Sequence, residues 1–269
     1  MDDYIIKPNQ FNNNMNILIY GDPGVGKTYL AGTAQDNPYM ADVHVFNVDG
    51  GMLTLAERED IHATDIRSVD ALEAEMHKII NGDPKYKQVK TVVIDNITEL
   101  QTLTLEHIVS NAITVSHRKD KQGRVASVDD IYIEDYGKAG KQLARVLRGY
   151  RDLPMHVIYI AHRKDRMRKG TQTLEESKPA LIESLATSVM GYMDFVWYLY
   201  MADTVETSKD GQEIINTNRY LLTHPYNLFR AKTRGTKFAE ALGGVIIDPN
   251  LNDIMNIYIQ CSERKGETK

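Results

Sequence analysis

The stretch GDPGVGKT, residues 21–28, decides the fold of this 269-residue chain. It fits the pattern G-x-x-x-x-G-K-[ST], in which glycines let backbone N–H groups turn inward around phosphate oxygens. The pattern places a lysine on the β- and γ-phosphates and a hydroxyl residue on Mg²⁺. An apolar strand at 17–20 precedes the stretch, and a helix is expected from about Lys27. A chance glycine-rich turn does not need such flanks, so the stretch predicts a phosphate-binding loop (P-loop).

Strand patterns alternate with helical patterns along the chain. We expect strands at 17–20, 43–48, 91–94, 155–161, 194–201 and 219–223, and helices from Lys27 and at 69–81, 98–115 and 136–151. Residues 116–135, with a short element at 131–133, and residues 163–178 are expected to be loops, and Asp210-Gly211 a turn. The alternation predicts an α/β fold with a mainly parallel central sheet flanked by helices. One domain over 17–261 is the simplest organisation, with an N-terminal arm at 1–16 and a charged tail at 262–269.

Composition excludes several classes of protein. The chain carries 32 basic and 37 acidic residues, which excludes a generally basic nucleic-acid-coating protein but not a local basic groove. Its single cysteine, Cys261, excludes a disulfide framework within the chain and a cysteine-based zinc site. The longest apolar run, 195–202, is shorter than the roughly 20 residues that a bilayer span needs, and no secretory signal is visible. We therefore expect a cytoplasmic protein with no membrane partner.

Three polar residues end predicted strands, and each has two interpretations. Asp95 is a candidate ligand of Mg²⁺, or only a cap for the helix that follows. Asp49 can polarise an attacking water, or belong to an Asp-Gly-Gly turn. His162 can donate a hydrogen bond to the γ-phosphate and sense hydrolysis, or be structural, as most lone histidines are. With a P-loop in the same chain, we favour the functional interpretation of all three.

The ordered set of motifs resembles the RecA-like ATPase core. In chain order the motifs are GDPGVGKT, VFNVDGG, VVIDNITEL, DYGKAGKQL, HVIYIAH, DFVWYLY and AKTRG. Two further features point to a narrower group within this family, namely Asp-Tyr-Gly at 135–137 before a helix and Ala-His at 161–162. In this combination the chain is similar to phage-encoded single-strand annealing ATPases that consist of the core alone. The resemblance implies a RecA-like P-loop NTPase core over most of the chain.

The same resemblance implies cofactors and partners. ATP and Mg²⁺ are the implied cofactors, and single-stranded DNA is the implied partner, with annealing or strand exchange in phage recombination as the activity. A homo-oligomer, either a ring or a filament, is implied, with ATP at the subunit interfaces. A single-strand-binding protein is a further candidate partner.

Site residues follow from the resemblance by position. The predicted nucleotide-binding residues are Gly21, Asp22, Pro23, Gly24, Val25, Gly26, Lys27, Thr28 and Tyr29. Lys27 and Thr28 correspond to the Walker A pair and Asp95 to the Walker B carboxylate, so Thr28 and Asp95 are the expected Mg²⁺ ligands. Asp49 stands where relatives usually have a catalytic glutamate, one methylene longer, and His162 stands at the polar sensor. Lys232 and Arg234 fall where cations reach a neighbour's γ-phosphate.

Two basic stretches are candidates for DNA binding. The first directly follows His162 and contains five cations, namely Arg163, Lys164, Arg166, Arg168 and Lys169. Such cations neutralise backbone phosphates and make binding depend on salt, whereas most charged runs are only solvated loops. The second and weaker stretch includes Arg118 and Lys119. The first stretch is the better candidate because it adjoins the predicted sensor.

Two other function classes remain open at this point. A P-loop kinase would use the run at 163–169 as an arginine-rich lid over a small acceptor. A non-enzymatic scaffold switched by ATP would bind nucleotide and a protein partner with little hydrolysis, which the shorter Asp49 side chain motivates. ATP turnover that is stimulated by DNA would distinguish a RecA-like ATPase from both the kinase and the scaffold.

Overall fold

The computed structural model describes residues 14–207 and 213–263. The strands are β1 (Asn16–Gly21), β2 (Val43–Asn47), β3 (His62–Asp65), β4 (Thr91–Asp95), β5 (His156–Met167), β6 (Leu174–Pro179), β7 (Phe195–Thr207), β8 (Glu213–Leu222), β9 (Lys232–Thr233) and β10 (Val245–Ile247). The α-helices are α1 (Lys27–Gly32), α2 (Val69–Ile80), α3 (Ile97–Thr114), α4 (Ile133–Arg151), α5 (Glu183–Tyr192), α6 (Thr236–Leu242) and α7 (Leu251–Glu263). Short 3₁₀ helices are η2 (Thr33–Asp36), η3 (Met52–Leu55) and η4 (Pro84–Tyr86).

The strands of the described residues form one mixed sheet with a parallel centre. Its main order is β10-β8-β7-β1-β5-β4-β2-β3, while β6 pairs with β5 and β9 with β7. The run from β7 to β3 is parallel throughout, and β8, β10, β6 and β9 are antiparallel to their neighbours. The carboxyl ends of β1, β4 and β2 therefore meet at one edge of the sheet. This confirms the predicted α/β fold and sets the position of the site, because ligands bind at that edge in such sheets.

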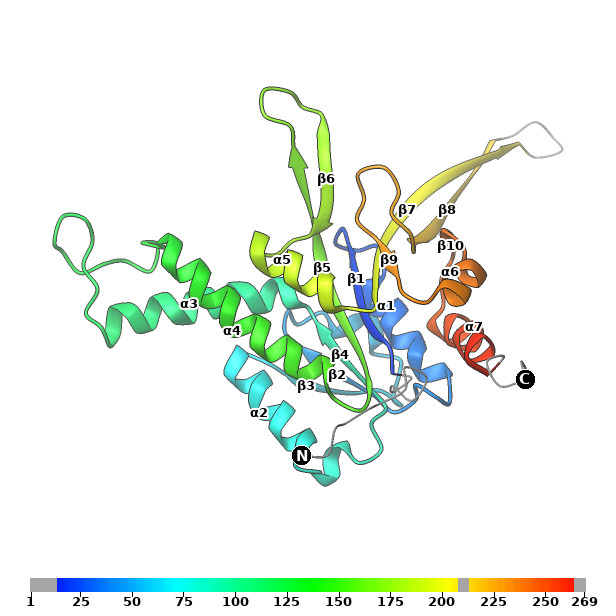
Figure 1. Ribbon diagram of the computed structural model, residues 1–269, viewed down its shortest axis with the longest axis horizontal. Coiled ribbons are helices and arrows are strands. Elements are labelled where there is room, and N and C mark those ends of the chain that lie inside the picture. The colour runs from blue at the N-terminus through cyan, green and yellow to red at the C-terminus, as the bar shows by residue number, and fades with distance from the viewer. Residues whose placement is uncertain (1–13, 208–212, 264–269) are drawn as a thin grey trace, which may run out of the picture.

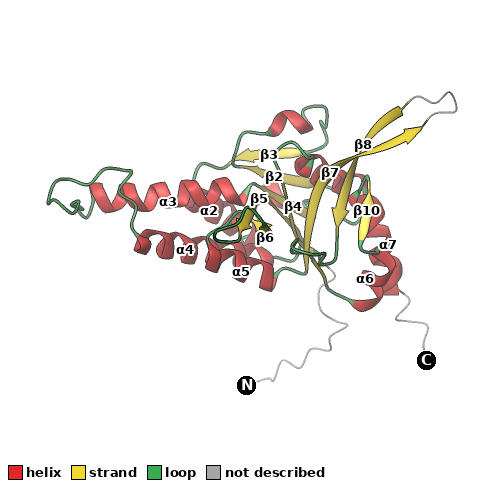
Figure 2. Cartoon of the chain, turned by 90° about the horizontal axis from the view of Figure 1, so that it is seen from above, coloured by secondary structure: helices red, strands yellow, loops and turns green. Residues whose placement is uncertain are grey.

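Alternating strand residues build two cores, one on each face of the sheet. On one face Leu18 and Tyr20 of β1 pack with apolar residues of α2, α3, α4 and α5. On the other face Ile17 and Ile19 pack with residues of α1, α6 and α7. Figure 2 shows α2, α3, α4 and α5 on one side of the strands and α6 and α7 on the other. Since β1 is buried on both faces, the P-loop that follows it starts from a rigid strand.

The largest difference from the sequence prediction concerns residues 163–178, which are not a loop. β5 continues to Met167 and pairs with β6 in an antiparallel hairpin that stands away from the sheet (Figure 1). His162 is therefore inside a long strand rather than at its end. The prediction was wrong because the exposed half of this hairpin lacks the apolar alternation that reveals a half-buried strand.

Other boundaries differ by smaller amounts. Residues 131–133 form no separate element, since α4 begins at Ile133 with the side chain of Asp135 accepting from the Tyr132 N–H. Met15 is buried and Asn16 begins β1, so the described structure starts within the predicted arm, while α7 extends past residue 261 to Glu263. The apolar residues of the arm at 4–6 and the turn at Asp210-Gly211 lie outside the described residues. Within those residues, none of the helices combines the length and apolarity required to cross a lipid bilayer.

Candidate nucleotide-binding site

The P-loop connects β1 to α1 and forms the floor of a cavity of about 340 Å³. Gly24 and Gly26 adopt φ angles of 80° and 93°, in the left-handed region that favours glycine. The cavity is lined by Pro23, Gly24, Gly26, Lys27, Thr28, Tyr29, Asp49, Thr54, Asp95, Asn96, His162 and Arg219. Six of the nine predicted nucleotide-binding residues are thus at its surface. Val25 is instead buried in the core.

Lys27 is held inside this loop. Its Nζ donates to the carbonyl oxygens of Gly21 at 3.0 Å and Asp22 at 2.7 Å. Burial lowers the pKa of Lys27, and the carboxylates of Asp95, Asp22 and Asp49 oppose that effect. An ammonium group that is buried against carbonyl dipoles gains a stronger partner when a phosphate enters, so the arrangement fits an anionic ligand.

Thr28 and Asp95, the two expected Mg²⁺ ligands, are in direct contact. Thr28 Oγ1 donates to Asp95 Oδ2 at 2.6 Å, and Asp95 is almost fully buried at the end of β4. Burial raises the pKa of Asp95 to about 6, partly offset by the Thr28 hydrogen bond. Among the described residues no cluster of three or more His, Cys, Asp or Glu side chains forms a closed metal site. Mg²⁺ suits one carboxylate plus phosphate oxygens and waters, so this pair fits that ion without further protein ligands.

Asp49, Asn96 and His162 form a polar chain along the cavity wall. Asn96 Nδ2 donates to Asp49 Oδ2 at 2.6 Å and lies 3.4 Å from His162 Nε2. The Asn96 side chain also accepts from the Glu99 N–H at 2.8 Å and so caps α3. Asp49 is exposed to solvent, and Asn96 fixes the direction of its carboxylate. A fixed, exposed carboxylate above a P-loop can orient a water molecule.

His162 faces the same space from the middle of β5. Its backbone N–H donates to Thr98 Oγ1 at 3.0 Å, and its register partner is Gly21. Burial is the main reason that the pKa of His162 is lowered, followed by the positive charge of Lys27. Its Nδ1 is buried and has no hydrogen-bond partner within the part of the chain that the structure describes. The imidazole is therefore neutral near pH 7, and one nitrogen stays open to a new contact.

Sequence reasoning missed three residues of the cavity: Asn96, Thr54 and Arg219. Asn96 lies within VVIDNITEL directly after Asp95 without a signal of its own, and Thr54 follows the Asp-Gly-Gly turn outside any motif. Arg219 comes from β8, and its guanidinium carbon lies 5.3 Å from the ring centroid of Tyr29. No local signal marks Arg219, because it reaches the P-loop only through the pairing of β8 with β7 and of β7 with β1.

Comparison with known families agrees with this geometry. The family model described as AAA domain matches residues 13–235 of the chain. The chain belongs to this family. The P-loop and every other residue at the surface of the cavity fall within the matched region of the AAA domain. No curated protein matches the chain.

In this AAA domain the first basic stretch is part of the β5–β6 hairpin. The Arg163 guanidinium donates to Asp22 at 3.0 Å, to the Tyr198 hydroxyl at 2.7 Å and to both carboxylate oxygens of Asp165. It also lies over the rings of Tyr198 and Phe229. Because these contacts occupy most of its donors, Arg163 is a link between the P-loop and the hairpin rather than a cation available to DNA.

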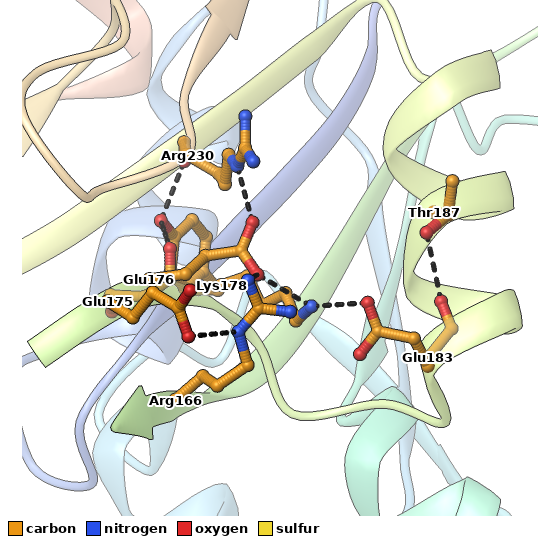
Figure 3. Close-up of polar contacts among 9 residues, drawn as sticks. Arg166, Glu175, Glu176, Lys178, Glu183, Thr187 and Arg230 are labelled. Atoms are coloured by element: carbon orange, nitrogen blue, oxygen red, sulfur yellow. Dashed lines mark hydrogen bonds and ion pairs between the residues drawn. The ribbon is translucent and has the colours of Figure 1, made fainter. Parts of the chain in front are cut away.

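An ionic network centred on the buried side chains of Glu176 and Lys178 lies at the base of the hairpin (Figure 3). Glu176 on β6 accepts from Arg230 at 2.7 Å and from Lys178 at 2.8 Å, and Lys178 also reaches Glu183 of α5 at 2.6 Å. Arg166 lies 3.2 Å from Glu175 across the hairpin. These contacts tie the hairpin to α5 and to the segment before β9. In this AAA domain the base of the hairpin is therefore held against α5 and the segment around Arg230.

The remaining hairpin cations differ from Arg163 and Arg166. Lys164 is exposed on β5, and Arg168 and Lys169 are exposed at the turn. Within residues 14–207 and 213–263, none of these three forms an ion pair. They are the part of the stretch whose charge faces solvent.

The second basic stretch does not have the predicted character. Arg118 forms a two-pronged ion pair with Asp135, at 2.6 and 2.8 Å, and Asp135 is fully buried. The prediction that Arg118 contacts DNA is therefore corrected to a structural role, which anchors the start of α4. Lys119 is exposed, but it lies in the loop between α3 and α4, which projects from the molecule separately from the β5–β6 hairpin (Figure 1).

Lys232 and Arg234 lie away from the cavity of their own chain. Lys232 pairs with Val196, near the start of β7, and β9 is therefore at the opposite edge of the sheet from the P-loop. The Lys232 Nζ donates to the carbonyl of Met190 at 2.5 Å, and Arg234 donates to Gly191 and Asp194. Burial, followed by the charge of Arg234, lowers the pKa of Lys232 to about 8. Within its own chain, each cation donates to carbonyl groups at the end of α5. Contact with the γ-phosphate of a neighbouring subunit stays a prediction.

Proposed function

We propose that this AAA domain binds ATP with Mg²⁺ and hydrolyses it in response to single-stranded DNA. One observation carries the proposal: strand β5 runs from the cavity directly into the basic hairpin. His162 lines the cavity, and the next residue, Arg163, holds the P-loop carboxylate of Asp22. The same strand then presents Lys164 to solvent and leads to the turn with Arg168 and Lys169.

Each residue of the cavity has a role in this proposal. Lys27 exchanges its carbonyl contacts for phosphate oxygens, and Thr28 and Asp95 hold Mg²⁺. Bound Mg²⁺ would supply positive charge to the β- and γ-phosphates. Asp49, oriented by Asn96, accepts a proton from the attacking water or fixes its direction. His162 is neutral and offers its ring to the γ-phosphate, so loss of that group changes its contacts.

Three parts of the proposal extend beyond a single chain. Annealing or strand exchange is the activity that the resemblance to phage recombination ATPases supports best. A homo-oligomer would place Lys232 and Arg234 against the nucleotide of a neighbour, which requires them to leave their contacts at the end of α5. A single-strand-binding protein would be the partner that delivers DNA.

The alternative classes fit these contacts less well. A kinase lid must move over its acceptor, whereas the run at 163–169 belongs to a hairpin that the network of Glu176 and Lys178 holds in place. A scaffold that does not hydrolyse ATP has no need for a carboxylate oriented as Asp49 is. Both alternatives predict ATP binding without a response to DNA.

The test is ATP turnover with and without single-stranded DNA at low and at physiological salt. We expect stimulation that is absent in Lys27→Ala and strongly reduced in the triple variant Lys164→Ala, Arg168→Ala, Lys169→Ala. The control triple variant Lys87→Ala, Lys141→Ala, Lys237→Ala removes the same charge from exposed sites outside the hairpin. Each lost phosphate contact lowers the salt slope of single-strand binding by about 0.7, so the hairpin variant should lose about 2. Equal behaviour of the two triple variants, or turnover that ignores DNA, overturns the proposal.

A further inference from the structure

Arg219 reaches the cavity from the flank opposite to the acidic residues. In the sheet, β5, β4 and β2 lie on one side of β1 and carry or precede His162, Asp95 and Asp49. β7 and β8 lie on the other side of β1, and β8 carries Arg219. The P-loop is between them. The charges in the cavity are therefore distributed asymmetrically, with the carboxylates of Asp49 and Asp95 on one flank and the guanidinium of Arg219 on the other.

This direction fixes how a nucleotide would lie in the cavity. The γ-phosphate belongs where Thr28 and Asp95 can share Mg²⁺ with it and where His162 and Asp49 face it. The α-phosphate and the nucleoside must then extend toward the other flank. Tyr29, the residue after Thr28, and Arg219 line that flank. A cation there meets the negative charge that ATP and ADP have in common.

The Arg219 side chain is placed by contacts with the P-loop itself. Its guanidinium lies over the Tyr29 ring, and a Cβ on Gly26 would come within 2.7 Å of its Nε, so the side chain lies directly against the P-loop backbone. The backbone N–H of Arg219 donates to Asp248 at 3.0 Å, which holds the strand without using the side chain. The Nε is buried and, among the residues that the structure describes, has no acceptor. A buried donor without an acceptor is costly, and a phosphate oxygen supplies one.

We propose that Arg219 is a nucleotide-binding cation acting within its own subunit, on the α-phosphate side of a nucleoside di- or triphosphate. Tyr29 supports it by providing the ring on which the guanidinium rests. This assignment rests on the proposed ATP site and adds to it the residue that binds the part of the ligand unchanged by hydrolysis. Arg219 thus contributes to affinity for substrate and product alike, in contrast to His162.

Equilibrium titration of ATP and of ADP without DNA tests the assignment. We expect Arg219→Ala to weaken binding of both nucleotides by the same factor, about tenfold, since a charge-assisted hydrogen bond is lost in both complexes. Arg219→Lys keeps the charge and should recover part of the loss, and it provides a folded variant if the alanine variant is unstable. Tyr29→Ala should weaken binding of both nucleotides by a smaller, equal factor, and Tyr29→Phe, which keeps the ring under the guanidinium, should lose less affinity than Tyr29→Ala.

Two results would overturn the assignment. Unchanged affinity for both nucleotides would reduce Arg219 to a packing residue, and a loss confined to ATP would move it to the γ-phosphate. The titration contains no DNA, so its result is independent of the DNA-stimulated turnover assay. A chain that binds both nucleotides but whose turnover does not respond to DNA contradicts the proposed function and leaves this assignment intact. A wild-type chain that binds neither nucleotide overturns the ATP site and this assignment together.

Discussion

The Arg163 guanidinium on β5 donates to the carboxylate of Asp22 in the P-loop at 3.0 Å, although 141 residues separate the two in sequence. The backbone carbonyl of Asp22 accepts from Lys27, and its carboxylate accepts from Arg163. One residue thus contacts both the P-loop lysine and the hairpin strand β5. In the proposed function, an entering phosphate would draw Lys27 away from the Asp22 carbonyl and let Asp22 shift. The contact between Asp22 and Arg163 would then link the nucleotide state to the hairpin.

Asp22→Asn should weaken this route while preserving the shape of the loop. The ion pair is partly exposed, so its loss should leave stability close to the wild-type value. We expect the ratio of DNA-stimulated to basal ATP turnover to fall about fivefold, at the lower end of common coupling energies. Asp36→Asn breaks a similar Arg–Asp pair with Arg58 outside the cavity and serves as the matched control. An unchanged ratio in Asp22→Asn would show that the hairpin senses nucleotide by another contact.

Asp49→Asn separates catalysis from binding. The amide cannot accept a proton from water, so we expect turnover to fall by about 10²-fold or more while ATP affinity stays near the wild-type value. Turnover and equilibrium titration measured on the same preparation check both halves. Glu57→Gln, at an exposed carboxylate outside the cavity, removes the same charge and should behave like wild type. Loss of ATP binding in Asp49→Asn would contradict a role in orienting water.

The parts of the site that sequence revealed are those with local signals. GDPGVGKT and the apolar strand before Asp95 each lie within a few consecutive residues, and the parallel sheet brings them together at one edge. The β5–β6 hairpin escaped detection because its strands carry charged and polar residues even where they are buried, as at Glu176 and Lys178. Arg219 escaped because its position depends on a path across three strands, from β8 through β7 to β1. The DNA-binding prediction for Arg118 was wrong because the sequence shows the charge of Arg118 but not its ion pair with the buried Asp135.

Asp95 should make stability depend on pH. Its folded pKa of about 6 lies above the ordinary value of 3.8, so the contribution of Asp95 to stability is most favourable at low pH and declines as pH rises from about 4 through 6. Ionised at neutral pH, the buried carboxylate costs about 3 kcal/mol. We expect Asp95→Asn to raise the unfolding free energy at pH 7.5 without Mg²⁺ or nucleotide, and the gain to shrink toward pH 4.

Scanning calorimetry of both proteins at several pH values measures that difference. Mg²⁺ with ATP should reverse it, because the ligands stabilise only the wild-type carboxylate. A gain that stays constant between pH 4 and 7.5 would contradict the titration of Asp95 as its cause.

The pair of Arg118 and Asp135 yields the clearest contrast between structural and DNA-binding roles. The Arg118 side chain is 13% exposed, and Asp135 is fully buried. Arg118→Ala leaves a buried carboxylate without its partner, so we expect a loss of about 3–5 kcal/mol in unfolding free energy. Lys119→Ala, next in sequence and exposed, should change stability by less than about 0.5 kcal/mol.

The loss in Arg118→Ala should itself depend on pH. Arg118 is the main cause of the lowered pKa of Asp135, so the stabilisation is present above the ordinary carboxyl pKa and disappears as pH falls through the lower folded value. Denaturant unfolding of the wild-type protein and both variants, at pH 7 and at the lowest pH where they fold, checks this. Full stability of Arg118→Ala together with a loss of affinity for single-stranded DNA would support the DNA-binding role instead. Such a result would mean that Asp135 does not need the guanidinium, which would then be available to a DNA phosphate.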